Sequence, residues 1–225
     1  MADKTEKSTA SAKLNGFLEK NRKPVLITFI VVLVLVIGFV AGAIIVSTTS
    51  KKDLAAVEAY YYDLMDTSTD LEDSEIKKRA TECVENLAPY TKKGGIAGVR
   101  ANMLSAELTY ILADYESSIS YYDAAIAKGK KSYTAPICMY NKASCYEELG
   151  KLDEAAESYR AAAEFKDFAM ITHAYFSLGR VLEAKGDYSG AVQAYTSAKE
   201  AFSDDEWTNL AITRIIALQS EGKAE

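Results

Sequence analysis

The sequence of 225 residues contains little of what breaks regular structure, with only 3 prolines and 12 glycines. That composition excludes a collagen-like chain, and 49% hydrophobic residues exclude a disordered one. Histidine is equally scarce, because His173 is the only one. No metal site or catalytic dyad that needs two imidazoles can therefore form. Helix is the expected structure, and much of enzyme chemistry is disfavoured.

Cysteine is also sparse, and its three positions favour a structural role. With Cys83, Cys138 and Cys145, at most one disulfide can form within the chain. Cys138 and Cys145 lie two turns apart on one expected helix, about 10 Å along its axis, which exceeds the ~7 Å Cα limit for a bridge. All three are expected to be small buried residues, and their redox state stays open.

Positive charge is scarce over most of the chain. The net charge is −6, but residues 1–46 hold 6 of the 26 Lys and Arg and only 3 of the 32 acids. The remainder therefore carries an excess of nine negative charges. Binding to nucleic acid is not expected, because phosphate recognition needs clustered cations.

One long apolar run stands out at residues 25–46, where 22 residues carry no charge. As a helix it would be about 33 Å long, close to the ~30 Å hydrocarbon core of a bilayer. Pro24 suits the first turn of that helix, and Lys20, Arg22 and Lys23 precede it. The positive flank predicts a cytoplasmic N-terminus and a domain on the other side of the membrane.

A cleaved signal peptide is the alternative interpretation, since Ala41, Gly42 and Ala43 have the form of a cleavage site. Against it, the run is longer than the ~7 to 15 apolar residues of an ordinary signal peptide. It also continues past that site through residues 44–46. A retained anchor is favoured.

Beyond residue 50 a pattern of paired helices recurs in residues 104–128, 140–164 and 176–200. The turn glycines Gly150 and Gly186 are 36 residues apart, and Ala113 takes the equivalent place in the first copy. Small and aromatic residues recur between the turns, at Ala106, Ala143 and Gly179, at Ser118, Ala155 and Ala191, at Tyr122, Tyr159 and Tyr195, and at Ala125, Ala162 and Ala198. This pattern resembles the tetratricopeptide repeat.

The resemblance implies an all-α chain, with one N-terminal transmembrane helix followed by a tetratricopeptide-repeat α-solenoid. The expected repeats are 99–132, 136–169 and 172–205, with a closing helix over 208–222. Their spacing exceeds the usual length of about 34 residues, which predicts lengthened turns at 129–133 and 165–168. The expected domains are a basic tail (1–23), the span (24–46), an irregular helical cap (47–98) and the repeats with the closing helix (99–225).

Local signals support this layout. The cap is expected to contain helices at 52–65 and 73–87, the second ended by Pro89. Asp114, Asp167 and Asp187 are expected to cap helix N-termini. Trp207 on the closing helix is expected to seal the end of the array by packing.

The resemblance also implies a partner-binding groove, because in such arrays the first helix of each pair lines a concave face. Its candidate residues are Arg100, Met103, Glu107, Tyr110, Tyr140, Ser144, Glu147, His173, Phe176, Arg180 and Glu183, with Asn209, Ile212 and Ile216 from the closing helix. Tyr140 and Phe176 are expected to face a partner rather than the core, with Arg180 orienting an acidic group. The carboxylate clamp of chaperone-tail binders is not expected, since of its residues only Asn141 is present.

No catalytic, cofactor-binding or metal-ligating residue is assigned. The sequence has no Walker A motif, nucleophile elbow, zinc-protease motif or dinucleotide fingerprint. Paired carboxylates such as Glu147 and Glu148 are common on solvated helices. An acidic hydrolase is the less favoured alternative to a binding protein.

The order of tail, span and repeat domain resembles the ancillary Sec translocon subunit family of bacterial envelopes. That resemblance implies a single-pass protein of the inner membrane, with its repeats in the periplasm beside translocon subunits and chaperones. A scaffold of another envelope assembly, in secretion, motility or division, is the alternative. A homo-oligomer also stays open.

Overall fold

The structure, a computed structural model, describes residues 14–67, 71–202 and 206–224. Within these ranges all regular elements are helical, namely α2 (Arg22–Thr67), α3 (Asp73–Thr91), α4 (Gly95–Ile111), α5 (Tyr115–Lys128), α6 (Thr134–Glu148), α7 (Leu152–Ala163), α8 (Ile171–Ala184), α9 (Tyr188–Ala201) and α10 (Glu206–Ser220). The chain divides into two compact units that meet between Thr49 and Ser50. Most of the expected basic tail, residues 1–13, lies outside the described residues.

The first unit contains the N-terminal part of α2. Among the described residues, α2 is the one helix that is long and apolar enough to cross a membrane. Its apolar side chains are exposed, including Leu35 at 66%, Phe39 at 79% and Val46 at 69%. Pro24 lies in the first turn, where the missing N–H costs no helical hydrogen bond.

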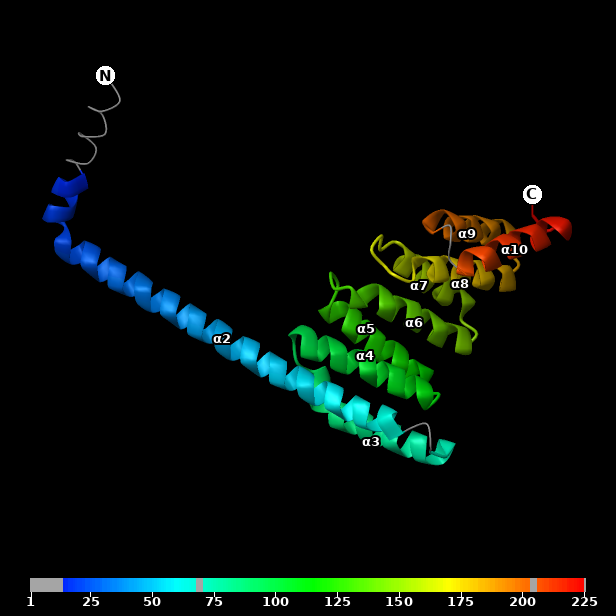
Figure 1. The fold of residues 1–225 in the computed structure, drawn as a ribbon, viewed down its shortest axis with the longest axis horizontal. Helices are drawn as coiled ribbons and strands as arrows, with labels where there is room; N and C mark the ends of the chain where they lie inside the picture. Colours follow the sequence, from blue (N-terminus) through cyan, green and yellow to red (C-terminus); the bar gives the residue numbers. More distant parts are fainter. Residues whose placement is uncertain (1–13, 68–70, 203–205, 225) are drawn as a thin grey trace, which may run out of the picture. The chain divides into compact units, whose positions relative to one another are not determined.

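The second unit is an array of helix pairs. From α3 to α10, each helix packs on its neighbour in sequence, in the order that Figure 1 shows from green to red. The part of α2 that follows residue 50 joins α3 and α4 in one core, which contains Val57, Cys83, Leu87 and Leu104. The pairs are therefore α2 with α3, α4 with α5, α6 with α7, and α8 with α9, with α10 as the last helix.

Small residues allow the helices of each pair to approach closely. Ala143 and Ala155 are completely buried, and the ring of Tyr159 is 1% exposed. In the next pair, a Cβ added at Gly179 would lie 2.5 Å from the ring of Tyr195. Glycine is required there because the tyrosine occupies the space that any side chain would need. The predicted pattern of small and aromatic residues is thus confirmed as the packing of the array.

The turns inside the pairs also follow the predicted frame. Gly150 and Gly186 have φ of +68° and +80°, and Ala113 takes the same left-handed conformation at +58°. Asp114 Oδ1 accepts from the Ser117 N–H at 3.1 Å, which caps α5 as expected. Asp187 caps α9 in the same way through the Gly190 N–H at 2.9 Å.

The cap predicted at Asp167 is wrong. α8 begins at Ile171, and Asp167 lies in the loop that precedes it. An extra turn forms there because Phe168 is buried and its N–H donates to the Phe165 carbonyl at 3.0 Å. The Ile171 N–H then donates to the Phe168 carbonyl at 3.1 Å. Asp167 therefore belongs to the lengthened turn expected at 165–168, and α8 begins next to the start expected for the repeat at 172.

The helix end predicted at Pro89 is also wrong, since α3 continues to Thr91. Proline is tolerated there because it lies in the last turn and removes only one hydrogen bond. The hydroxyl of Thr91 donates to the Ala88 carbonyl at 2.9 Å. The Lys93 N–H donates to the Tyr90 carbonyl at 3.0 Å, so backbone polar groups stay paired past the proline.

Candidate functional site

The predicted groove residues lie on the first helices of successive pairs. The structure places Arg100, Met103, Glu107 and Tyr110 on α4, Tyr140, Ser144 and Glu147 on α6, His173, Phe176, Arg180 and Glu183 on α8, and Asn209, Ile212 and Ile216 on α10. Two pairs of them contact each other across neighbouring helices, namely Tyr140 with His173 and Glu147 with Arg180. A side chain that is already hydrogen-bonded or ion-paired within the chain is less available to bind a partner.

The charged groups on α6 and α8 are paired within the chain. Glu147 Oε1 accepts from Arg180 Nη2 at 2.7 Å and from the Tyr159 hydroxyl at 2.6 Å. Glu183 repeats this arrangement with Arg214 of α10 and the Tyr195 hydroxyl at 3.0 Å. Burial raises the pKa of both tyrosines, so their hydroxyls stay protonated and donate. Arg214 was not predicted, although it shares this role with Arg180.

Aromatic rings fill the space between α6, α8 and α10. The His173 ring stacks on Trp207 with centroids 3.7 Å apart and planes at 14°. The Tyr140 hydroxyl lies 2.9 Å from His173 Nε2, and the Phe176 ring lies 5.2 Å from Trp207. Trp207 therefore packs at the end of the array, as expected.

Tyr140 and Phe176 are half-buried and pack against the core cluster of the last two pairs. Both therefore contact the core, which was not expected, and their role in facing a partner stays a prediction. Trp207 covers Phe176, and the Tyr140 ring lies 6.4 Å from Phe168 of the loop before α8. Ser144 is likewise engaged, since its hydroxyl lies 3.1 Å from that of Tyr159. Asn209 and Ile216 are exposed on α10, and Ile212 is half-buried.

On α4 the candidate residues are partly buried against α2. Arg100 donates to both carboxylate oxygens of Glu58, at 2.6 and 3.2 Å. Met103 is only 3% exposed. Burial raises the pKa of Glu107, although the Tyr61 hydroxyl and Arg100 oppose that shift. Tyr110 donates to Glu148 Oε1 at 3.2 Å.

Two adjoining concavities lie where the first helices begin, and we call them together the Tyr133 groove. The first, of about 370 Å³, is lined by residues of α2, α4 and the start of α6, namely Leu54, Glu58, Tyr62, Ile96, Val99, Arg100, Met103, Tyr133, Thr134 and Ile137. The second, of about 350 Å³, is lined by the loops before α6 and α8, namely Lys131, Ser132, Tyr133, Pro136, Ile137, Phe165, Lys166, Asp167, Phe168, Ala169 and Met170. They share Tyr133 and Ile137. Arg100 and Met103 are the predicted residues that line this groove.

The loop that carries Tyr133 is held in place by its own hydrogen bonds. The Gly129 N–H donates to the Ala125 carbonyl at 2.9 Å, and the Ser132 N–H donates to the Gly129 carbonyl at 2.8 Å. A Cβ at Gly129 would lie 3.2 Å from Val99 Cγ2, so glycine lets the loop pack closely on α4. Tyr133 itself is 77% exposed. The lengthened turn was predicted, but the aromatic side chain that it presents was missed.

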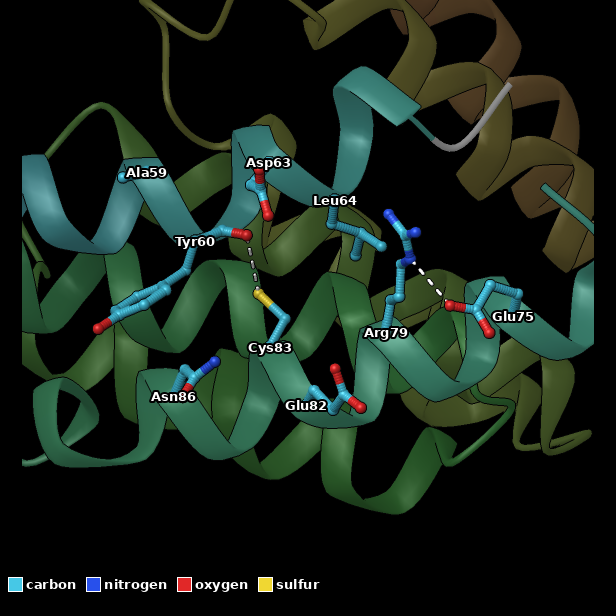
Figure 2. Close-up of a pocket in the computed structure, with 9 residues that line it drawn as sticks. All are labelled: Ala59, Tyr60, Asp63, Leu64, Glu75, Arg79, Glu82, Cys83 and Asn86. Carbon is cyan, nitrogen blue, oxygen red and sulfur yellow. Dashed lines mark hydrogen bonds and ion pairs between the residues drawn. The ribbon is translucent and has the colours of Figure 1, made fainter. Parts of the chain in front are cut away.

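A polar pocket of about 650 Å³ lies between α2 and α3, and Figure 2 shows its lining residues. Arg79 pairs with Glu75 at 3.1 Å, and the Cys83 thiol donates to the Tyr60 carbonyl at 3.4 Å. Burial, with help from Asp63, raises the pKa of Cys83 to about 11, so it remains an unreactive thiol. Cys83, Cys138 and Cys145 are all buried, as expected, and all three are free. Across the described ranges, no three His, Cys, Asp or Glu side chains are arranged to hold a metal.

Comparison with known proteins identifies the repeats. The family model for the tetratricopeptide repeat matches residues 106–169 and 166–206. A TPR repeat-containing protein of Treponema pallidum (strain Nichols) is 26% identical over 234 residues, which cover 96% of this chain and 98% of that protein.

Solved structures show the same fold. Nearly identical TPR-like repeats from Podosopora anserina superpose with a TM-score of 0.59 at 12% identity, over 74% of this chain and 87% of theirs. The apo form of RapI gives a TM-score of 0.52 at 16% identity, over 70% of this chain and 43% of RapI. Residues 106–206 therefore match the tetratricopeptide repeat, and the helical array to which they belong has the fold of a TPR-like solenoid.

Proposed function

We propose that this chain is a membrane-anchored adaptor whose repeat domain binds protein or peptide partners outside the cytoplasm. The observation that carries the proposal is the combination, in one chain, of a repeat array with an exposed apolar helix. Tetratricopeptide repeats are protein-interaction scaffolds, since each stacked pair adds to an extended surface. The apolar helix would hold that surface at a membrane.

Side-chain exposure along α2 supports the anchor. A contiguous apolar surface of this length is rare on a soluble protein and is typical of a membrane-inserted helix. The alignment with the Treponema pallidum protein covers 96% of this chain, so it includes most or all of residues 25–46. Lys20, Arg22 and Lys23 would keep the N-terminus in the cytoplasm and direct the repeats to the periplasm of a bacterial inner membrane.

The partners that this architecture favours are translocon subunits and periplasmic chaperones. That proposal rests on the resemblance to the ancillary Sec translocon subunit family. A scaffold for another envelope assembly, such as a secretion, motility or division complex, fits the same architecture. Self-association is a further alternative, and the experiment below separates the first two.

We propose no catalytic role. Of the paired carboxylates noted in the sequence, Glu147 accepts from Arg180 and Tyr159 within the array. Glu148 accepts from Tyr110.

The test is co-purification of the full-length tagged chain from crosslinked, detergent-solubilised membranes, with mass spectrometry of the captured proteins. Recovery of translocon subunits and chaperones is expected, while a different envelope complex would favour the alternative scaffold. Recovery of the chain alone would contradict the adaptor role. Protease added to right-side-out spheroplasts should digest the repeat domain, and an intact-mass measurement should find the N-terminus retained. A mature chain that starts at Ile44 would contradict the anchor.

A further inference from the structure

We propose that the Tyr133 groove binds an acidic protein segment that also carries apolar side chains. This inference rests on the adaptor role and names the kind of partner that the domain takes. It is independent of the identity of that partner. Three observations lead to it. They are the apolar lining of the groove, the positive charge at its rim and the ion pairing of the cations on the neighbouring surface.

The groove exposes large apolar side chains from three separate segments. Tyr133 is 77% exposed, Tyr62 of α2 is 62% exposed and Ile96 at the start of α4 is 41% exposed. Met170 adds a fourth, at 37%. Side chains of this kind are enriched where proteins bind one another, because burial of aromatic and Met side chains supplies most of the affinity.

The rim of the groove is positive, although the domain as a whole is strongly negative. Within the described residues, three exposed lysines of the two lengthened loops form no ion pair, namely Lys130, Lys131 and Lys166, and neither does Lys128 at the end of α5. The same loops contain only two acids, Glu164 and Asp167. Lys131 and Lys166 both line the groove beside Phe165 and Met170. A partner that places carboxylates at this rim meets an attractive field, whereas the rest of the acidic domain repels it.

The rest of the first-helix surface offers no comparable set of cations. Outside the groove, Arg180 is paired with Glu147 and Arg214 with Glu183. Arg100 and Glu58, which line the groove, are paired with each other. An acidic partner would have to displace a carboxylate that already receives well-formed hydrogen bonds. At the lysines of the Tyr133 groove, a partner displaces no carboxylate of the chain. Acidic segments should therefore bind preferentially at this site.

The test uses the full-length chain in nanodiscs of phosphatidylcholine, which carries no net charge. The probe is a fluorescein-labelled peptide in which Asp and Glu alternate with Leu and Phe. The matched peptide replaces the acids by Lys. Fluorescence anisotropy should show binding of the acidic peptide only, with an affinity that falls as NaCl is added. Binding of both peptides with equal affinity would overturn the proposal.

Variants then locate the site. Replacement of both rim lysines, Lys131→Glu with Lys166→Glu, should weaken the acidic peptide about fivefold or more. Tyr133→Ala should have an effect of similar size, and it should leave folding intact because the side chain is exposed. The matched control is Lys77→Glu with Lys199→Glu, which changes the net charge equally at exposed positions outside the groove. An equal loss in that control would overturn the site.

The same variants separate this inference from the adaptor role. If the full chain captures its membrane partners and the groove variants capture them equally well, the adaptor role stands and the groove is not the docking site. If the peptide binds as described but no membrane partner is captured, the groove stands as a binding site and the adaptor role fails. A joint loss of peptide binding and partner capture in the groove variants supports both.

Discussion

Arg180 Nη2 and Glu147 Oε1 lie 2.7 Å apart, on the first helices of two successive repeats. The same carboxylate oxygen accepts from Tyr159, on the second helix of its own repeat, at 2.6 Å. One acidic side chain thus joins three helices. Glu183, Tyr195 and Arg214 form the same arrangement one repeat later. Both carboxylates are largely shielded from water, at 18% and 20% exposure, so these contacts are screened less than ordinary surface pairs.

Substitution of Glu147 should loosen the array. Glu147→Gln removes the charge from a hydrogen-bonded pair, so the free energy of unfolding should fall by about 1 to 2 kcal/mol. Trp207, the single tryptophan, stacks on His173 and reports unfolding by fluorescence in urea. Glu157→Gln, at an exposed position of α7, is the control and should change stability by less than about 0.5 kcal/mol. Equal effects in the two variants would contradict the joining role of Glu147.

Gly179→Ala should be destabilising although alanine favours helix. The new methyl group would lie 2.5 Å from the Tyr195 ring, which has no room to move in a buried layer. Overpacking of this kind costs about 1 to 3 kcal/mol, which urea unfolding can measure. Gly94→Ala is the matched control, because nothing lies within 4 Å of its added Cβ. A neutral Gly179→Ala would mean that Tyr195 does not pack where the structure places it.

Stability should depend on the ionisation of Glu107. Burial raises its folded pKa, so the folded state binds a proton more tightly than the unfolded state. The resulting stability is fully present below the ordinary carboxyl pKa and is lost as pH rises through the raised value. Glu107→Gln should therefore flatten the pH dependence of the urea midpoint and should not destabilise the domain at neutral pH. A midpoint that keeps the wild-type pH dependence would contradict this assignment.

The cysteines should resist alkylation in the folded protein. Burial raises the pKa of Cys138 to about 12 and that of Cys83 to about 11, so almost no thiolate is present at pH 8. Iodoacetamide should label none of the three thiols until urea unfolds the chain, as intact mass would show. Labelling of the folded chain at one equivalent would show that a cysteine is accessible.

The sequence predicted the packing of the array well because that packing depends on local sterics. A residue such as Gly179 or Ala143 must be small wherever two helices touch, so its position repeats with the helices. The helix boundaries predicted from Pro89 and Asp167 were wrong because local residue preferences did not decide them. A proline in a last turn is tolerated, and the burial of Phe168 set the start of α8 more strongly than a local capping residue did.

The candidate site was predicted only in part. Arg100 and Met103 line the groove. Tyr133 was missed because it lines a groove only where α2, α4 and a second loop lie beside it. No spacing rule brings those segments together. Arg214 was missed because a fixed frame of 36 residues placed Asn209, Ile212 and Ile216 on the groove instead. The extra residues between repeats and the unusual Lys-Lys-Ser-Tyr turn were the signals that could have indicated the site.

After the buried Gly129, the loop to Tyr133 is largely exposed and is held mainly by its own backbone hydrogen bonds. Residues at its tip can therefore be exchanged by mutation without the compensating changes that a buried position demands. Related chains could therefore bind different partners while their helical framework stays the same. Selection for a new partner would act first on a few loop positions and only later, if at all, on the helices beneath them.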